Sequence, residues 1–135
     1  MTRLYQEERG PRVYEITIQS HFSAAHRLRY LHGQCEELHG HNWKIEVSVT
    51  SRRLGKDGVA LDFGILKQNV AKVLHTLDHK FLNDLPYFQK REPSSENIAK
   101  YIFDQLQPEI RKRAVALKKV TAWESETASA TYSRR

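Results

Sequence analysis

The sequence has one cysteine, Cys35, in 135 residues. A single cysteine cannot form a disulfide within its own chain, so Cys35 is a free thiol, a metal ligand or a nucleophile. No apolar run approaches the roughly 20 residues that a membrane-spanning helix needs. The first residues, MTRLYQEERGPR, have neither the apolar middle of a secretory signal nor the acid-poor composition of a transit peptide. These absences predict a cytoplasmic protein that does not bind membranes.

Positively charged side chains are in modest excess, because 22 Lys and Arg against 16 Asp and Glu give a net charge of +6. This charge favours anionic partners without identifying one. The densest basic run, residues 111–113, lacks interleaved aromatic side chains that could stack on bases, so we expect no nucleic-acid partner. The length suits one domain. We therefore expect a flexible arm over residues 1–12 and a single domain over residues 13–135.

Alternation of apolar and polar residues predicts two strands, one on each side of the only cysteine. The residues expected to share the buried face of the first strand are Tyr14, Ile16, Ile18, Ser20 and Phe22. Those of the second strand are Trp43, Ile45, Val47 and Val49. The two strands are expected to pair antiparallel.

Helical spacing follows the turn at residues 55–58. The apolar residues of the first expected helix are Phe63, Leu66, Val70, Val73, Leu74 and Leu77, and those of the second are Ile98, Ile102, Leu106 and Ile110. Asp62 is expected to cap the first helix, and a serine hydroxyl within residues 93–96 the second. Residues 118–125 predict a final strand. The order predicts an α+β fold, an antiparallel sheet with both helices on one face.

The stretch CEELHGH contains the chemistry. His39 and His41 project from the same strand face and could bind one metal ion, although two histidines at this spacing could equally line a polar strand end. Antiparallel pairing could bring His26 beside them. Three imidazoles leave zinc one open position, as in catalytic sites. Cys35 could close the site as a fourth ligand, act beside it as a base or nucleophile, or be an inert buried thiol.

Six motifs, in this order and at these separations, resemble the 6-pyruvoyl-tetrahydropterin synthase family: FSAAHRL, CEELHGHNW, LDF, LDHKFLND, PSSENIA and WESET. The resemblance covers roughly residues 14–128. The three residues between the cysteine and HGH resemble the bacterial 6-carboxy-tetrahydropterin synthase branch of queuosine biosynthesis. The resemblance implies the tunnelling fold, with four antiparallel strands and two helices per subunit. It further implies trimers that close a β-barrel and a homohexamer of two stacked trimers.

Roles for the residues follow from this resemblance. It implies that His26, His39 and His41 bind catalytic Zn²⁺, while Cys35 stays free as the proton-abstracting base. It also implies that Asp78 and His79 form a relay with Cys35, in which His79 exchanges a proton and Asp78 orients it. Without the resemblance, Asp78 and His79 would equally suit a polar helix end.

Glu124 shares strand parity with Val120 and Ala122, so it should project toward the apolar side, where an unpaired carboxylate is costly. The resemblance implies that Glu124 binds the pterin ring through hydrogen bonds from the ring amino and NH groups. Further substrate-binding residues implied by the resemblance are Ser95, Glu96 and Thr127.

The implied reaction converts 7,8-dihydroneopterin triphosphate to 6-carboxy-5,6,7,8-tetrahydropterin, with release of acetaldehyde and triphosphate. The main alternative is the pyruvoyl branch of the family, which eliminates triphosphate but keeps the three-carbon side chain. A distant alternative is a small zinc-stabilised nucleic-acid-binding module, suggested by the basic charge and the Cys/His cluster. Such modules usually contain paired cysteines, which this chain lacks.

Overall fold

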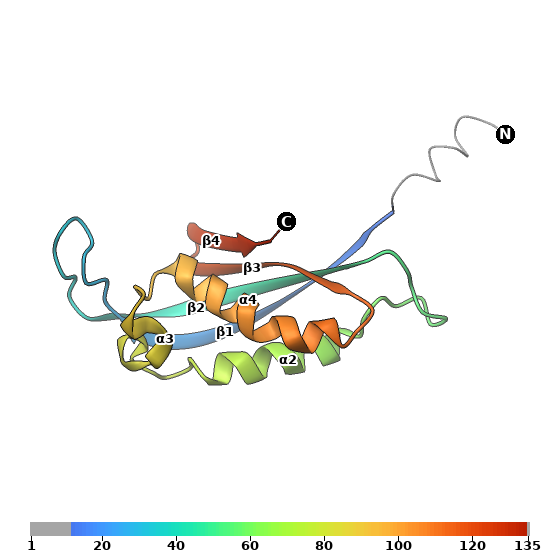
Figure 1. Cartoon of the computed structure of the whole chain (residues 1–135), viewed down its shortest axis with the longest axis horizontal. Coiled ribbons are helices and arrows are strands. Elements are labelled where there is room, and N and C mark those ends of the chain that lie inside the picture. The colour runs from blue at the N-terminus through green and yellow to red at the C-terminus, as the bar shows by residue number, and fades with distance from the viewer. Residues whose placement is uncertain (1–11, 135) are drawn as a thin grey trace, which may run out of the picture.

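The computed structural model describes residues 12–134 (Figure 1). The elements in chain order are β1 (Tyr14–His26), β2 (His39–Ser51), α2 (Phe63–His75), η1 (Leu82–Asp84), α3 (Pro86–Gln89), α4 (Ser95–Arg111), β3 (Ala116–Ser125) and β4 (Ala128–Ser133). The strands form one antiparallel sheet in the order β1-β2-β3-β4. The α+β fold is confirmed. The arm predicted over residues 1–12 lies outside the described range except for Arg12.

The register of β1 and β2 places the two predicted apolar faces on the same side of the sheet. Phe22 pairs with Trp43 and Ile18 with Val47, and the pairing continues to His26 opposite His39. Because side chains alternate along each strand, the histidines at these strand ends share a face with the buried core residues. The predicted antiparallel pairing is therefore confirmed, and it brings the histidine motifs together.

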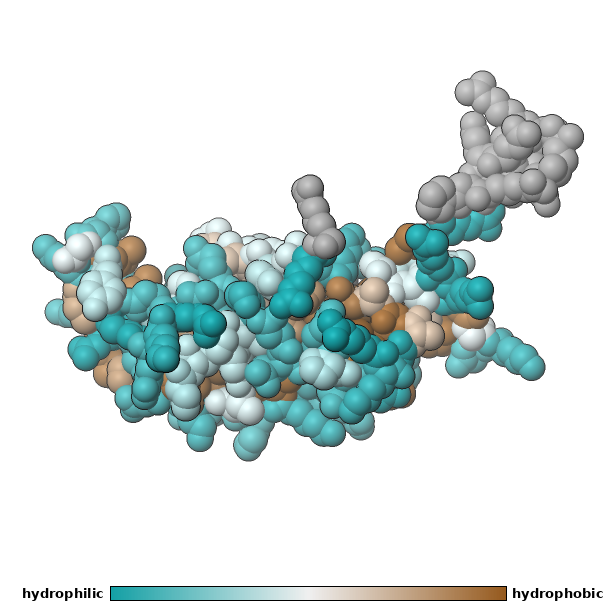
Figure 2. All heavy atoms as spheres, in the orientation of Figure 1, coloured by the Kyte–Doolittle hydropathy of each residue, from teal (hydrophilic) through white to brown (hydrophobic). Residues whose placement is uncertain are grey.

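Helices α2 and α4 cover this face of the sheet, with α2 against β1 and α4 against β3 and β4 (Figure 1). The core between them is apolar, and its largest fully buried side chains include Trp43, Phe88, Phe103, Ile45, Leu66 and Ile102. Hydrophilic side chains cover most of the face seen in Figure 2. No helix among residues 12–134 has the length and apolarity to cross a membrane.

The two expected helix caps have different outcomes. Ser94 caps α4, because its Oγ accepts a hydrogen bond from the Asn97 backbone N–H at 3.2 Å. Asp62 holds the N-cap position of α2, but its side chain makes no capping bond. Its backbone carbonyl accepts from Ile65, while the carboxylate lies beside Gly64. The prediction of a side-chain cap at Asp62 was therefore wrong.

Alternation also missed the last strand and two short helices. The predicted strand over residues 118–125 is part of β3, which a two-residue turn joins to β4. The β4 sequence, ASATYS, contains one large apolar side chain, Tyr132, and so carries little alternation. The family resemblance, which implied four strands, corrected the count. Strands β1 and β4 form the two edges of the sheet.

Replacement of Leu106 by alanine should destabilise the fold strongly. Leu106 lies on α4 and is fully buried in the core. Removing its side chain loses apolar burial and leaves a cavity, which costs about 2–5 kcal/mol of unfolding free energy. Denaturant titration measures the change. The matched control is Leu54→Ala, at a leucine 41% exposed, where we expect a change of about 0.5 kcal/mol or less. Equal losses of unfolding free energy in both variants would contradict the burial of Leu106 in the core.

Candidate active site

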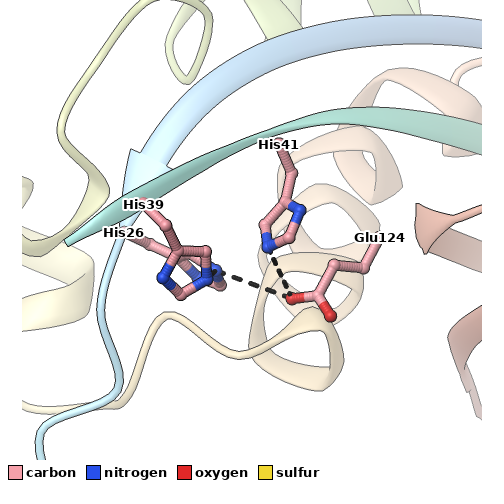
Figure 3. Close-up of side chains that lie close together, drawn as sticks. All are labelled: His26, His39, His41 and Glu124. Carbon is pink, nitrogen blue, oxygen red and sulfur yellow. Dashed lines mark hydrogen bonds and ion pairs between the residues drawn. The ribbon is translucent and has the colours of Figure 1, made fainter. Parts of the chain in front are cut away.

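Four donor side chains gather at one end of the sheet, on the face that the helices cover (Figure 3). His26 is the last residue of β1, His39 and His41 begin β2, and Glu124 lies near the end of β3. One ligand atom from each of these four residues lies within 4.8 Å of the other three. The structure therefore brings together the three predicted zinc ligands, and it adds a carboxylate to them.

The distances within this group are short. His26 Nε2 lies 3.0 Å from His39 Nε2, and Glu124 Oε1 lies 3.5 Å from His26 Nε2 and 3.4 Å from His41 Nε2. His26 is buried and the other three are partly exposed. The four donors converge on one point at the edge of the core.

Backbone carbonyls fix the orientation of two of the imidazoles. His26 Nδ1 lies 2.7 Å from the carbonyl oxygen of Pro93, and His39 Nδ1 lies 2.9 Å from that of Glu37. A carbonyl oxygen only accepts, so both Nδ1 atoms donate and both Nε2 atoms present lone pairs. A second ring nitrogen held in this way is typical of metal-binding histidines.

This donor set fits a divalent metal ion. Two ring nitrogens lie 3.0 Å apart with a carboxylate beside them, and a cation or a proton between the nitrogens would stabilise this arrangement. Burial lowers the pKa of His26 and outweighs the raising effect of its hydrogen bond to Pro93. The lowered pKa keeps the ring neutral and able to bind metal. Three nitrogens and one oxygen are ligands that Zn²⁺ accepts.

Aromatic side chains of the core pack against the histidines. Trp43 is fully buried, stacks on Phe22 at 5.2 Å, and meets the rings of His26 and His41 edge to face at 4.9 and 5.1 Å. Its Nε1 donates to Ser95 Oγ at 3.4 Å. Ser95, at the start of α4, therefore contacts the floor of the site.

The other two residues expected beside the substrate are more peripheral. Glu96 is exposed in the first turn of α4, and Thr127 is exposed in the turn between β3 and β4. Neither joins the four-donor group among residues 12–134.

Asp78 and His79 form the predicted pair at the edge of β1. Asp78 Oδ2 lies 3.0 Å from His79 Nδ1, and Asp78 Oδ1 accepts the Ser23 backbone N–H at 2.9 Å. His79 holds a positive φ of 59°, and its own N–H donates to the Ser23 carbonyl at 2.6 Å. A non-glycine residue held in this region is typical of functional sites. The His79 side chain is 81% exposed and projects from the edge of the sheet.

The hydrogen bond from the Ser23 N–H lowers the pKa of Asp78, with His79 as a smaller contributor. An aspartate with a lowered folded-state pKa stabilises the fold above its unfolded pKa of about 3.9, and this stabilisation is lost as the pH falls through the folded value. Asp78→Asn should therefore lower the unfolding free energy at pH 7, and the difference from the wild type should shrink below about pH 4. Unfolding curves across pH measure it.

The control for this prediction is His79→Ala. It removes the smaller cause of the shift and leaves the Ser23 bond, so most of the pH dependence should remain. A pH dependence that disappears in His79→Ala but survives in Asp78→Asn would contradict this assignment.

Cys35 lies in the loop of residues 27–38 that joins β1 to β2 and projects beyond the sheet in Figure 1. The loop is closed at its base, because the Glu36 N–H donates to the Leu28 carbonyl at 2.8 Å and the Glu36 carboxylate accepts the Leu28 N–H at 2.9 Å. Cys35 is exposed. The fourth donor among residues 12–134 is Glu124 and not Cys35, so the thiol is outside the four-donor group that could hold a metal ion.

A cavity of about 480 Å³ adjoins the site. Residues from the ends of β1 and β2, including Ala25, Gly40 and His41, line it together with His79. Of the four donors, His41 lines this pocket, and of the Asp78–His79 pair, His79 does.

A family model described as 6-pyruvoyl tetrahydropterin synthase matches residues 15–135. The chain belongs to this family. Membership confirms the resemblance drawn from the six motifs and makes the chain an enzyme. The enzyme assignment takes the place of the distant alternative, a nucleic-acid-binding module.

Relatives from both branches of the 6-pyruvoyl tetrahydropterin synthase family are similar to the chain. A 6-carboxy-5,6,7,8-tetrahydropterin synthase of Bacillus subtilis is 31% identical over 113 residues, which cover 79% of this chain and 75% of the relative. A 6-pyruvoyl tetrahydrobiopterin synthase of Poecilia reticulata is 36% identical over 109 residues, which cover 70% of this chain and 74% of the relative.

The fold agrees with the family. A solved structure of Caenorhabditis elegans 6-pyruvoyl tetrahydropterin synthase superposes with a TM-score of 0.77 at 27% identity, covering 92% of this chain and 97% of the other. The expected tunnelling fold is therefore confirmed at the level of one subunit.

Sequence reasoning missed two features of this family site. It did not place Glu124 beside the histidines, although the parity of Glu124 with Val120 and Ala122 put it on the correct face. The pairing of β2 with β3 ends at Lys44 opposite Trp123, so Glu124 follows directly at the histidine end. The carbonyl partners of His26 and His39 come from loops and had no sequence pattern.

Proposed function

We propose that this enzyme is a zinc-dependent lyase that converts 7,8-dihydroneopterin triphosphate and water to 6-carboxy-5,6,7,8-tetrahydropterin, acetaldehyde and triphosphate, in queuosine biosynthesis. The observation that carries the proposal is the group of three imidazoles with Nε2 atoms turned inward, in a chain of this family. The name of the Bacillus subtilis relative supports the carboxy branch.

His26, His39 and His41 would hold the zinc ion, which when bound polarises oxygen atoms of the substrate side chain. Glu124 would accept hydrogen bonds from the pterin amino and ring NH groups, and Ser95, at the floor of the site, would line the same pocket with Glu96 and Thr127 beside it. These residues orient the substrate.

Cys35 would act as the base that removes a carbon-bound proton, since a thiolate near a cation forms readily. His79 would exchange the second proton, and Asp78, which is bonded to His79 Nδ1 at 3.0 Å, would hold that ring in orientation. Loss of triphosphate follows the proton transfers, and cleavage of the rearranged side chain releases acetaldehyde.

The sheet edges of the single chain support a homohexamer as the functional form. Strand β4 and the part of β1 before Ser23 lie at the two edges of the sheet within residues 12–134, and closure of three sheets into one barrel pairs such edges. His79 projects from the β1 edge with 81% of its side chain exposed, so a neighbouring subunit could supply the Cys35 that it serves. The pterin site would then lie between subunits in the cytoplasm, with no nucleic acid or membrane involved.

Incubation with 7,8-dihydroneopterin triphosphate tests the proposal. We expect acetaldehyde and triphosphate in equal amounts, with the carboxylated pterin identified by mass. The alternative, supported by the name of the Poecilia reticulata relative, is a 6-pyruvoyl-tetrahydropterin synthase. It predicts triphosphate without acetaldehyde and a product that keeps three side-chain carbons, a result that would contradict the carboxy assignment.

A further inference from the structure

We propose that Glu124 is the fourth metal ligand of the substrate-free enzyme, and that it leaves the metal when the pterin ring binds. The inference rests on the proposed function, because it takes pterin as the ligand for which Glu124 is exchanged. One carboxylate would then couple recognition of the ring to opening of the metal site.

The two distances from Glu124 to His26 and His41 suit four-coordinate zinc. Zinc binds nitrogen and oxygen at about 2.0–2.2 Å, so a tetrahedral site separates its ligand atoms by about 3.3–3.6 Å. Glu124 Oε1 lies 3.4 Å from His41 Nε2 and 3.5 Å from His26 Nε2, within this range. Figure 3 shows the Glu124 carboxylate directed at the histidines. Glu124 is thus at the spacing of a zinc ligand from two of the three imidazoles.

Glu124 is also the donor best able to move. The rings of His26 and His39 are held by carbonyl oxygens at 2.7 and 2.9 Å. Within residues 12–134, the Glu124 carboxylate has only His26 and His41 as polar side-chain partners. Its side chain is 36% exposed. It lies where the pairing of β3 with β4 shifts register, between Trp123 and Ser125. The ligand at the irregular strand end can therefore turn outward while the histidines stay fixed.

The two partners compete for the same oxygens. A carboxylate that accepts hydrogen bonds from both an amino and a ring NH group uses both of its oxygens in a forked arrangement. Glu124 Oε1 would have to leave the position between His26 and His41 to do so. Its departure removes one negative charge from the metal site and leaves three neutral ligands, the arrangement of a catalytic site. Zinc would become strongly polarising only when the pterin ring is in place.

Zinc affinity tests the resting ligand. In competition with a chromophoric chelator, and with zinc alone as the probe, Glu124→Gln should bind the ion about tenfold or more weakly than the wild type. The matched control is Glu126→Gln, which lies two residues away in the exposed turn and should bind as the wild type does. Unchanged affinity in Glu124→Gln would overturn the fourth-ligand assignment, and equal losses in both variants would show a general charge effect and overturn it too.

Cobalt substitution tests the exchange. The d–d bands of Co²⁺ report its coordination, and unsubstituted pterin, which lacks the side-chain hydroxyls that could bind the metal, serves as the ring probe. Pterin should change the spectrum of the Co²⁺ wild type and leave that of Co²⁺ Glu124→Gln unchanged. Fluorescence of pterin shows independently whether it binds the wild type. Binding without a spectral change would overturn the exchange alone, whereas failure of pterin to bind would overturn the pterin-binding function and the exchange together.

Discussion

Cys35→Ala is expected to abolish turnover and to leave the zinc content of the protein unchanged. The sulfur is exposed in the loop of residues 27–38, and the metal-binding group among residues 12–134 contains three histidines and Glu124 instead. Removing a general base typically slows a reaction by about 10²–10⁴-fold. Because Cys35 binds no metal in this account, the loss should appear in kcat. Acetaldehyde release and zinc per chain are the two measurements.

The matched control for Cys35→Ala is Gln34→Ala. Gln34 is the exposed neighbour in the same loop, and its replacement should leave both turnover and zinc nearly unchanged. Stoichiometric loss of zinc from Cys35→Ala would show that the sulfur is a ligand and not a base. Full activity of Cys35→Ala would remove the cysteine from the mechanism.

His39→Ala is expected to lose both zinc and activity. His39 Nε2 lies 3.0 Å from His26 Nε2, and its ring is fixed by the Glu37 carbonyl. Loss of a direct ligand should weaken zinc binding by more than about 100-fold, since even partners of ligands are worth 10–100-fold. Dialysis followed by metal analysis measures the loss. It should exceed that of Glu124→Gln, because Glu124 is the ligand that exchanges.

His75→Ala is the control for this variant. His75 is exposed at the last turn of α2, outside the metal-binding group, so its removal should leave zinc bound. Retention of stoichiometric zinc by His39→Ala after dialysis would contradict the three-histidine site. Such a result would leave the short distances between the rings without a chemical explanation.

The sequence predicted those parts of the fold that depend on strong periodicity. In β1 and β2 the alternating apolar residues include Phe22 and Trp43, which are buried and stacked on each other. Burial of one sheet face fixes the register, because a slip by one residue would turn every core side chain to water. The same register places His26 opposite His39. Convergence of the histidines therefore follows from the strand pattern.

The parts that were missed depend on tertiary contacts. Strand β4 is an edge strand of small residues, so pairing with β3 and not its own pattern defines it. Asp62 holds a capping position, but its carboxylate lies beside Gly64 and not over the free N–H groups. The short helices η1 and α3 lie in the connection to α4, where no period is long enough to read.

For the site, the sequence predicted which residue types take part but not the distances between them. The family resemblance implied that Asp78 and His79 act together, and the structure places their side chains 3.0 Å apart. That Glu124 approaches the histidines depends on where β3 ends relative to β2, and no pattern within one strand contains that information. The roles of Cys35, Glu124 and the serine at the start of α4 remain predictions for the variants described above.

X-ray absorption at the zinc edge distinguishes a free Cys35 thiol from a zinc-bound one. We expect a zinc ion in the wild-type protein surrounded by nitrogen and oxygen atoms at about 2.0–2.2 Å, with histidine outer-shell scattering and no sulfur. A zinc–sulfur distance of about 2.3 Å would show that Cys35 is a ligand, and it would contradict the assignment of the thiol as a free base beside a three-histidine metal site.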